Sequence, residues 1–239
     1  MKDFSEEKLP IFFKNNQELY SLYKEQLSIK DKFDFNEINI DSVKTIAGID
    51  VAYFKRDDIE YGVCCIDVFD IHTFEIIEKE TYISTVNFPY IPGYLSYREL
   101  PLIIGAYEKL EKMPDIFMLD GNGYLHPNHM GIATMFSLAT NQKSIGVAKT
   151  FYNFAKINFV LGNNFLDTVP IIIDNQLYGY VMRSRENCKP IFISPGNNLG
   201  FQNCIDIVKI CLNNESRIPI PTRTADLDTH LERKKVLVR

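Results

Sequence analysis

The chain has 239 residues, and its 46% hydrophobic content is enough to fill a core without a disulfide or a metal to hold the fold. Its net charge of −5, from 26 basic and 31 acidic residues, argues against a protein that binds polyanions over its whole surface. A local basic track stays open, because basic residues cluster along the second half of the chain.

Cysteine usage and the N-terminal sequence both favour a cytoplasmic protein. The five cysteines show no CxxC spacing, which indicates reduced thiols. The chain is charged from Lys2 onward and has no apolar run as long as a membrane span. We therefore expect a soluble, cytoplasmic protein with no signal peptide and no membrane partner.

The first half of the chain predicts one helix and three strands. Apolar residues recur at helical spacing over residues 15–29, which predicts an amphipathic helix. Three β-prone segments follow at residues 45–54, 61–69 and 74–83. The short polar turns between them are typical of an antiparallel meander. Asp50 lies in the middle of the first of these strands.

The second half alternates between helices and strands. A helix over residues 95–112 carries Glu99 on its first turns, with Pro101 near its start. A strand at 116–119, a helix at 131–139 and a strand at 145–148 predict a parallel β-α-β unit. The remaining expected elements are strands at 169–173, 178–182 and 190–193, a helix at 202–212, an extended segment at 219–223 and a helix at 225–235.

An antiparallel meander followed by parallel crossovers is the element order of the ribonuclease H-like fold. We expect a single α/β domain over residues 1–239, with a mixed central sheet of meander and parallel strands and with helices on both faces. In that fold the first strand and the strand after the first helix carry metal-binding carboxylates side by side, and Asp50 and Asp120 fall on those two elements.

Asp120 ends a buried strand and is followed by a turn that contains Gly121 and Gly123. A lone Asp-Gly pair is more often a simple turn. A buried Asp50 could instead be paired with Lys44 or Lys149, and the helix dipole alone favours a carboxylate such as Glu99.

Together, the three carboxylates predict an oxygen-rich site that holds Mg²⁺ and a substrate phosphate. Lys149, which closes a strand, could neutralise charge developing on that phosphate. His126 could orient a water or a phosphate, although a histidine in a loop is often only a local hydrogen-bonding residue.

The chain resembles the endonuclease V family, the deoxyinosine 3′-endonucleases, over residues 45–223. The matching blocks are residues 47–51, 89–99, 114–123, 126–127, 131–133, 145–149, 190–196 and 219–223. Blocks in this order and at compatible spacing are far more specific than any single motif.

The resemblance implies the roles of the acidic residues. Asp50 and Asp120 would bind Mg²⁺, with Mn²⁺ as a substitute, and Glu99 would complete the site directly or through water. Lys149 would be catalytic.

The resemblance also implies a wedge that enters the DNA duplex, formed by Pro89, Tyr90, Ile91 and Pro92. Two prolines stiffen this segment, and an aromatic ring can fill the gap left by an extruded base. Without the other blocks, a rigid surface turn would be the simpler interpretation. The extruded base would lie in a lesion pocket lined by Gly93, Leu95, Gly121, Asn122, Gly123 and His126.

Two positions depart from the family pattern. Asn197 and Asp226 stand where the family commonly has histidine. Asparagine cannot carry a proton near neutral pH, which puts a general-acid or metal-binding role at position 197 in doubt. Asp226, if it lies close to the site, could add a carboxylate.

We expect a monomeric, Mg²⁺-dependent endonuclease that recognises deoxyinosine in DNA. It would hydrolyse the second phosphodiester bond 3′ to the lesion and initiate DNA repair. The alternatives are an endoribonuclease acting on inosine in single-stranded RNA, for which the decisive 2′-OH contacts cannot be inferred from sequence, and an inosine-binding protein with weakened catalysis, suggested by Asn197.

Overall fold

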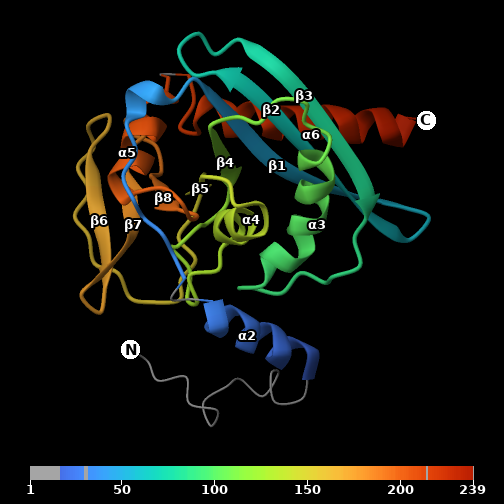
Figure 1. Cartoon of the computed structure of the whole chain (residues 1–239), viewed down its shortest axis with the longest axis horizontal. Helices are drawn as coiled ribbons and strands as arrows, with labels where there is room; N and C mark the ends of the chain where they lie inside the picture. Colours follow the sequence, from blue (N-terminus) through green and yellow to red (C-terminus); the bar gives the residue numbers. More distant parts are fainter. Residues whose placement is uncertain (1–16, 30–31, 214, 239) are drawn as a thin grey trace.

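A computed structural model describes residues 17–29, 32–213 and 215–238 (Figure 1). The strands are β1 (Thr45–Arg56), β2 (Ile59–Asp70), β3 (Ile76–Thr85), β4 (Ile116–Asp120), β5 (Ser144–Ala148), β6 (Thr168–Ile173), β7 (Gln176–Met182) and β8 (Ile191–Pro195). The helices are α2 (Gln17–Ile29), α3 (Leu95–Tyr107), α4 (Ile132–Thr140), α5 (Phe201–Ile210) and α6 (Ile220–Val238), with a 3-10 turn, η2 (Ile40–Ser42).

The strands form one eight-stranded sheet in the order β3-β2-β1-β4-β5-β8-β7-β6. β1, β4 and β5 run parallel at its centre, and β1, β2 and β3 form the expected antiparallel meander. On the other side, β8, β7 and β6 continue the sheet in antiparallel pairs. The expected mixed α/β fold of the ribonuclease H-like type is confirmed.

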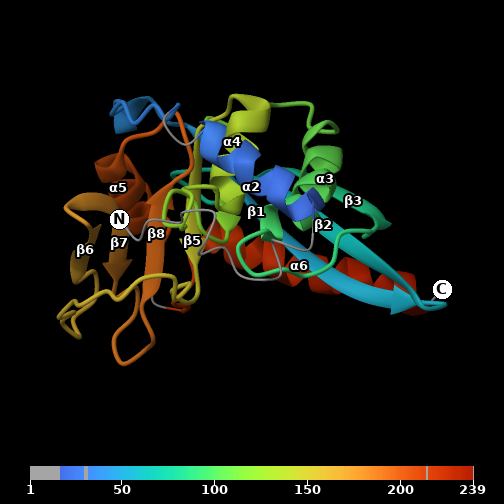
Figure 2. The ribbon, with the colours of Figure 1, turned by 90° about the horizontal axis from the view of Figure 1, so that it is seen from below.

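Helices cover both faces of the sheet (Figures 1 and 2). One face packs against α3 and α4 through side chains such as Ile49, Phe117 and Leu119. The other face packs against α5 through Ile46 and Met118, and α6 crosses β1 and β2 on this same side. Successive strand residues point to opposite faces, so odd-numbered β1 residues face α3 and even-numbered ones face α6.

Three sequence expectations need correction. Residues 219–223 are not an extended segment, because α6 begins at Ile220. Proline lacks only a donor that the first helical turn leaves unpaired, so Pro221 is compatible with a helix start. Pro101 lies inside α3 rather than near its start, and α3 ends at Tyr107 instead of residue 112.

The N-terminal helix α2 agrees with the expectation from residue 17 onward, and residues 15 and 16 lie outside the described ranges. Within those ranges, every helix is too short or too polar to cross a membrane.

Gly48 lets α6 approach β1 closely. A methyl group on Gly48 would lie 2.0 Å from the backbone oxygen of Pro221. The contact joins the middle of the sheet to the first turn of α6, and it leaves no space for a side chain. The position of α6 therefore depends on a residue without a Cβ atom.

We predict that Gly48→Ala lowers the free energy of unfolding by about 2 kcal/mol, because backbone atoms cannot yield to the added methyl group. Urea denaturation measures the change. Gly162→Ala is the matched control, since its methyl group would meet only the side chain of Asp167. Equal stability of the Gly48→Ala variant and the unmodified protein would contradict this packing.

Candidate active site

The two central strands bring two carboxylates to one edge of the sheet. β1 and β4 are parallel neighbours, and Ile49 pairs with Leu119. Asp50 and Asp120 are the next residues of the two strands, so they occupy adjacent positions on the face that α6 covers. A single register between neighbouring strands therefore makes the core of the acidic site.

Asp50 receives a hydrogen bond from helix α6, since the Thr229 hydroxyl donates to Asp50 Oδ2 at 3.1 Å. Burial and then the charges of Asp120 and Asp226 raise the pKa of Asp50 to about 7. The alternative of an ion pair with Lys44 is wrong, because the Lys44 ammonium donates to the backbone oxygen of Asp41.

Glu99 reaches the same edge from α3, on the opposite face of the sheet. Its side chain is buried, and the Tyr53 hydroxyl donates to Glu99 Oε1 at 2.9 Å. Burial raises the pKa of Glu99 to about 8, with a further contribution from the charges of Asp50 and Asp120. A small pocket is lined by all three carboxylates together with apolar residues such as Ile103.

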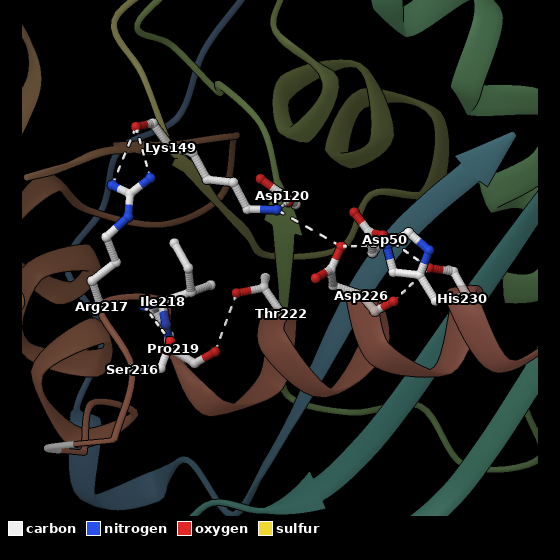
Figure 3. Close-up of polar contacts among 11 residues, drawn as sticks. Asp50, Asp120, Lys149, Ser216, Arg217, Ile218, Pro219, Thr222, Asp226 and His230 are labelled. Atoms are coloured by element: carbon white, nitrogen blue, oxygen red, sulfur yellow. Dashed lines mark hydrogen bonds and ion pairs between the residues drawn. The ribbon is translucent and has the colours of Figure 1, made fainter. Parts of the chain in front are cut away.

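Lys149 is the cation of this cluster (Figure 3). Its ammonium lies 2.5 Å from Asp120 Oδ2 and 3.8 Å from Asp226 Oδ1. Burial alone would lower the pKa of Lys149, but the neighbouring carboxylates, Asp120 first, raise it above its ordinary value. Asp226 therefore lies at the cluster, and His230 Nε2 lies 3.7 Å from Asp226 Oδ1.

Several residues that the sequence did not single out hold this arrangement. Arg217 donates to the backbone oxygen of Lys149 (Figure 3). It also donates to the backbone oxygens of Lys189 and Pro190, all at 3.0–3.4 Å, and so joins the end of β5 to the start of β8. Thr229 and Tyr53 were also missed. These side chains act through contacts between distant segments, which no local sequence pattern reveals.

The segment expected to form the wedge lies between β3 and α3. Tyr90 is 67% exposed between its two prolines, so its ring is presented to solvent. Gly93 follows with φ +83°, a conformation that favours glycine. A methyl group on Gly93 would lie 3.3 Å from the Tyr152 hydroxyl, so the Tyr152 side chain packs next to Gly93.

His126 holds this segment in place. Its Nδ1 accepts hydrogen bonds from the backbone N–H groups of Asn128 and Met130, so Nε2 carries the proton and donates to the Gly93 oxygen at 3.1 Å. Burial lowers the pKa of His126 to about 3. Both ring nitrogens are thus engaged within the protein, and the imidazole is neutral.

The turn after Asp120 packs against β8. Gly123 N–H donates to the Ser194 hydroxyl at 3.0 Å, and a methyl group on Gly123 would lie 2.2 Å from the Pro195 oxygen. Asn122 Oδ1 is buried without a hydrogen-bond partner among the described residues. Leu95 is the first residue of α3 and lies two residues after Gly93.

Asn197 lies away from the acidic cluster. Pro195 pairs with Ile145 at the start of β5, whereas Asp120 pairs with Val147 toward the end of that strand. Asn197 Oδ1 accepts a hydrogen bond from the backbone N–H of Asp34 at 2.7 Å. The suggestion that Asn197 stands near the site is therefore not supported by its contacts.

The donor set suits a hard cation. Mg²⁺ uses one or two carboxylates and keeps several waters, so Asp50 and Asp120 could hold it, with Glu99 near enough to bind through water. No group of three or more His, Cys, Asp or Glu side chains has ready-made ligand geometry in the described ranges. Binding would therefore require Lys149 to share or release the Asp120 oxygen that it contacts.

Asp50, Glu99 and Asp120 together form what we call the acidic edge. The mixed sheet and this acidic edge define a nuclease of the ribonuclease H-like fold. A family model for endonuclease V matches residues 23–227. Endonuclease V of Bacillus thuringiensis is 44% identical over 238 residues, which cover 99% of this chain and 98% of that protein. The chain belongs to the endonuclease V family, as its sequence blocks indicated.

Solved structures agree with the fold. The crystal structure of Bacillus subtilis endonuclease V is 41% identical, has a TM-score of 0.87 and covers 91% of this chain and 93% of that chain. Ciona intestinalis endonuclease V, in complex with a 24mer DNA containing an inosine followed by a ribo-adenosine, is 24% identical with a TM-score of 0.79. It covers 92% of this chain and 100% of that chain, and at this identity the likeness concerns the fold.

We predict that Glu99→Gln stabilises the metal-free protein increasingly as the pH rises from 5 to 9. Folded Glu99 keeps its proton up to about pH 8, whereas in the unfolded chain it loses it near pH 4.3. The folded state binds more protons in this window, so ionisation of Glu99 makes folding less favourable as pH rises. The stability difference between variant and unmodified protein should grow by on the order of 3 kcal/mol.

Urea denaturation in EDTA measures this difference. The control is Glu186→Gln, the same substitution at an exposed position. A Glu99→Gln stability difference that does not change between pH 5 and 9 would show that Glu99 is ionised in the folded protein throughout.

Proposed function

We propose that this chain is an Mg²⁺-dependent endonuclease that cuts DNA at deoxyinosine, at the second phosphodiester bond 3′ to the lesion, and so initiates repair. The observation that supports it best is the convergence of Asp50 and Asp120 on one sheet edge, with Glu99 opposite them and Lys149 between Asp120 and Asp226. The cut position comes from the family resemblance.

Bound Mg²⁺ would polarise the phosphoryl oxygen and lower the pKa of an attacking water. Asp50 and Asp120 would hold the ion, and the Thr229 hydroxyl fixes the Asp50 carboxylate by donating to its Oδ2 atom. Glu99 keeps a proton near neutral pH until a cation favours its ionised form. The Lys149 ammonium neutralises charge on the scissile phosphate from the end of β5.

Lesion recognition would use the exposed Tyr90. Its ring, held between Pro89 and Pro92, would fill the space left by an extruded base, which offsets a few kcal/mol of lost stacking. The base would lie between Gly93 and the turn at residues 121–123. An endonuclease V of Ciona intestinalis was solved with DNA that contains an inosine, and this chain belongs to the same family, which is the basis for proposing hypoxanthine as the base.

The function is tested with matched DNA and RNA strands that carry inosine or adenine at one position, incubated with Mg²⁺, Mn²⁺ or EDTA. We expect cleavage of the deoxyinosine DNA with either metal and none in EDTA. Faster cleavage of inosine RNA would favour the endoribonuclease alternative. Tight binding without cleavage in both metals would contradict catalysis by this site.

We predict that Asp120→Asn lowers the cleavage rate at least about a hundredfold while lesion binding stays within about threefold. The amide weakens the metal site but leaves Tyr90 in place. Single-turnover cleavage and fluorescence anisotropy measure the two effects. Asp58→Asn, in the turn between β1 and β2, is the control and should cut normally. Near-normal turnover of Asp120→Asn would remove Asp120 from the catalytic site.

We predict that Tyr90→Ala reduces the preference for inosine over adenine duplexes about tenfold, since an unfilled gap costs on the order of 1–3 kcal/mol of stacking. Tyr90→Phe keeps the ring and should keep the preference. Competition cleavage of the two duplexes measures the ratio. If Tyr90→Ala discriminates as well as Tyr90→Phe, Tyr90 is only a turn residue.

A further inference from the structure

Three charged side chains meet under helix α6, away from the acidic edge. Asp67 on β2 and Lys79 on β3 are directly opposite each other in the antiparallel register. The Lys79 ammonium lies 3.8 Å from Asp67 Oδ1 and donates a hydrogen bond to Asp228 Oδ2 on α6. We call Asp67, Lys79 and Asp228 the charge clip.

Asp67 is the buried member of the charge clip, whereas the Lys79 side chain is 44% exposed. Asp67 is 1% exposed, and its Oδ2 atom has no hydrogen-bond partner among the described residues. Burial, followed by the charge of Asp228, raises the pKa of Asp67 to about 7. An ion pair between a buried carboxylate and an exposed ammonium adds little net stability, because desolvation of the carboxylate and solvent screening of the ammonium offset the attraction. The position of the three residues, rather than their contribution to stability, therefore suggests what the charge clip does.

Asp228 lies on α6 between the two residues of that helix that reach the acidic edge. Thr229 follows it and donates to Asp50 Oδ2 at 3.1 Å. Asp226 precedes it by two residues and lies 3.8 Å from the Lys149 ammonium. Since one helical turn moves as a unit, a rotation of α6 at Asp228 would redirect both groups.

Helix α6 also contacts β1 and β2. The backbone of Pro221 lies against Gly48, and Arg233 donates to the Tyr53 oxygen at 3.3 Å. Val236 packs against apolar residues of β2. The charge clip extends these contacts to β3, which lies two strands away from β1 at the edge of the sheet. A contact displaced from the helix axis in this way opposes rolling of α6 about that axis.

We propose that Asp67, Lys79 and Asp228 are positioning residues for the nuclease site, which set the rotation of α6 and thereby the direction of the Thr229 hydroxyl and the Asp226 carboxylate. Their role would be to hold α6 in place without contacting substrate or metal. The kinetic part of this inference rests on the proposed function, whereas its structural part does not.

Kinetics of Lys79→Met test the proposal. We expect kcat on deoxyinosine DNA to fall about tenfold, with KM changed less than about twofold, because a misaligned site loses rate more than binding. Lys79→Arg keeps the charge and should recover most of kcat. The double variant Lys79→Asp/Asp228→Lys exchanges the two charges. It should be more active than either single variant.

Lys235→Met is the matched control, because the Lys235–Glu232 ion pair lies on the same helix but does not join it to the sheet. It should leave kcat unchanged. Unchanged kcat in Lys79→Met, with or without a lower melting temperature, would overturn the proposal and leave the charge clip a merely structural feature.

A crystal structure of Lys79→Met gives a reading that is independent of substrate. We expect the contact between Thr229 Oγ1 and Asp50 Oδ2 to lengthen beyond hydrogen-bond distance, and Lys79→Arg to restore it. A contact kept as in the unmodified protein would refute the proposal even if the chain cut no nucleic acid. Conversely, a displaced Thr229 in a protein without cleavage activity would refute only the proposed function.

Discussion

The repulsion among carboxylates at one edge of the sheet is the constraint on which the site depends. Adjacent parallel strands place Asp50 and Asp120 side by side, and Glu99 closes the group from α3. Lys149 supplies the opposing charge by contacting Asp120. Apolar residues at these positions would cost less to bury, so the group of carboxylates marks a candidate functional site rather than a device for stability.

The surrounding fold keeps these charges in place at a cost distributed over several elements. Gly48 has no side chain, and this allows α6 to approach β1 closely. The Arg217 guanidinium donates hydrogen bonds to three backbone oxygens around the end of β5. His126 is buried in its neutral form to fix Gly93. Each of these three residues is restricted in its own conformation or charge, and each fixes a neighbouring part of the site: α6, the end of β5, or Gly93.

Local patterns were enough to predict the meander, the parallel unit and the strands that carry Asp50 and Asp120, because alternation and short apolar runs are direct signals of strands. The start of α6 was missed, since prolines at residues 219 and 221 resemble a break as much as a helix start. Thr229 and the Asp67–Lys79 pair were not foreseen, because they depend on register between segments far apart in the chain. The position of Asn197 required the direction of β8, which sequence does not reveal.

The most direct test of the account is calorimetric titration of Mg²⁺ near pH 7 in two buffers of different ionisation enthalpy. Asp50 and Glu99 hold protons in this range without a cation, so binding should release protons and the measured heat should depend on the buffer. The release should be smaller in Asp50→Asn and in Glu99→Gln. An absence of Mg²⁺ binding, or heats that are identical in the two buffers, would contradict the assignment of the acidic edge as the cation site.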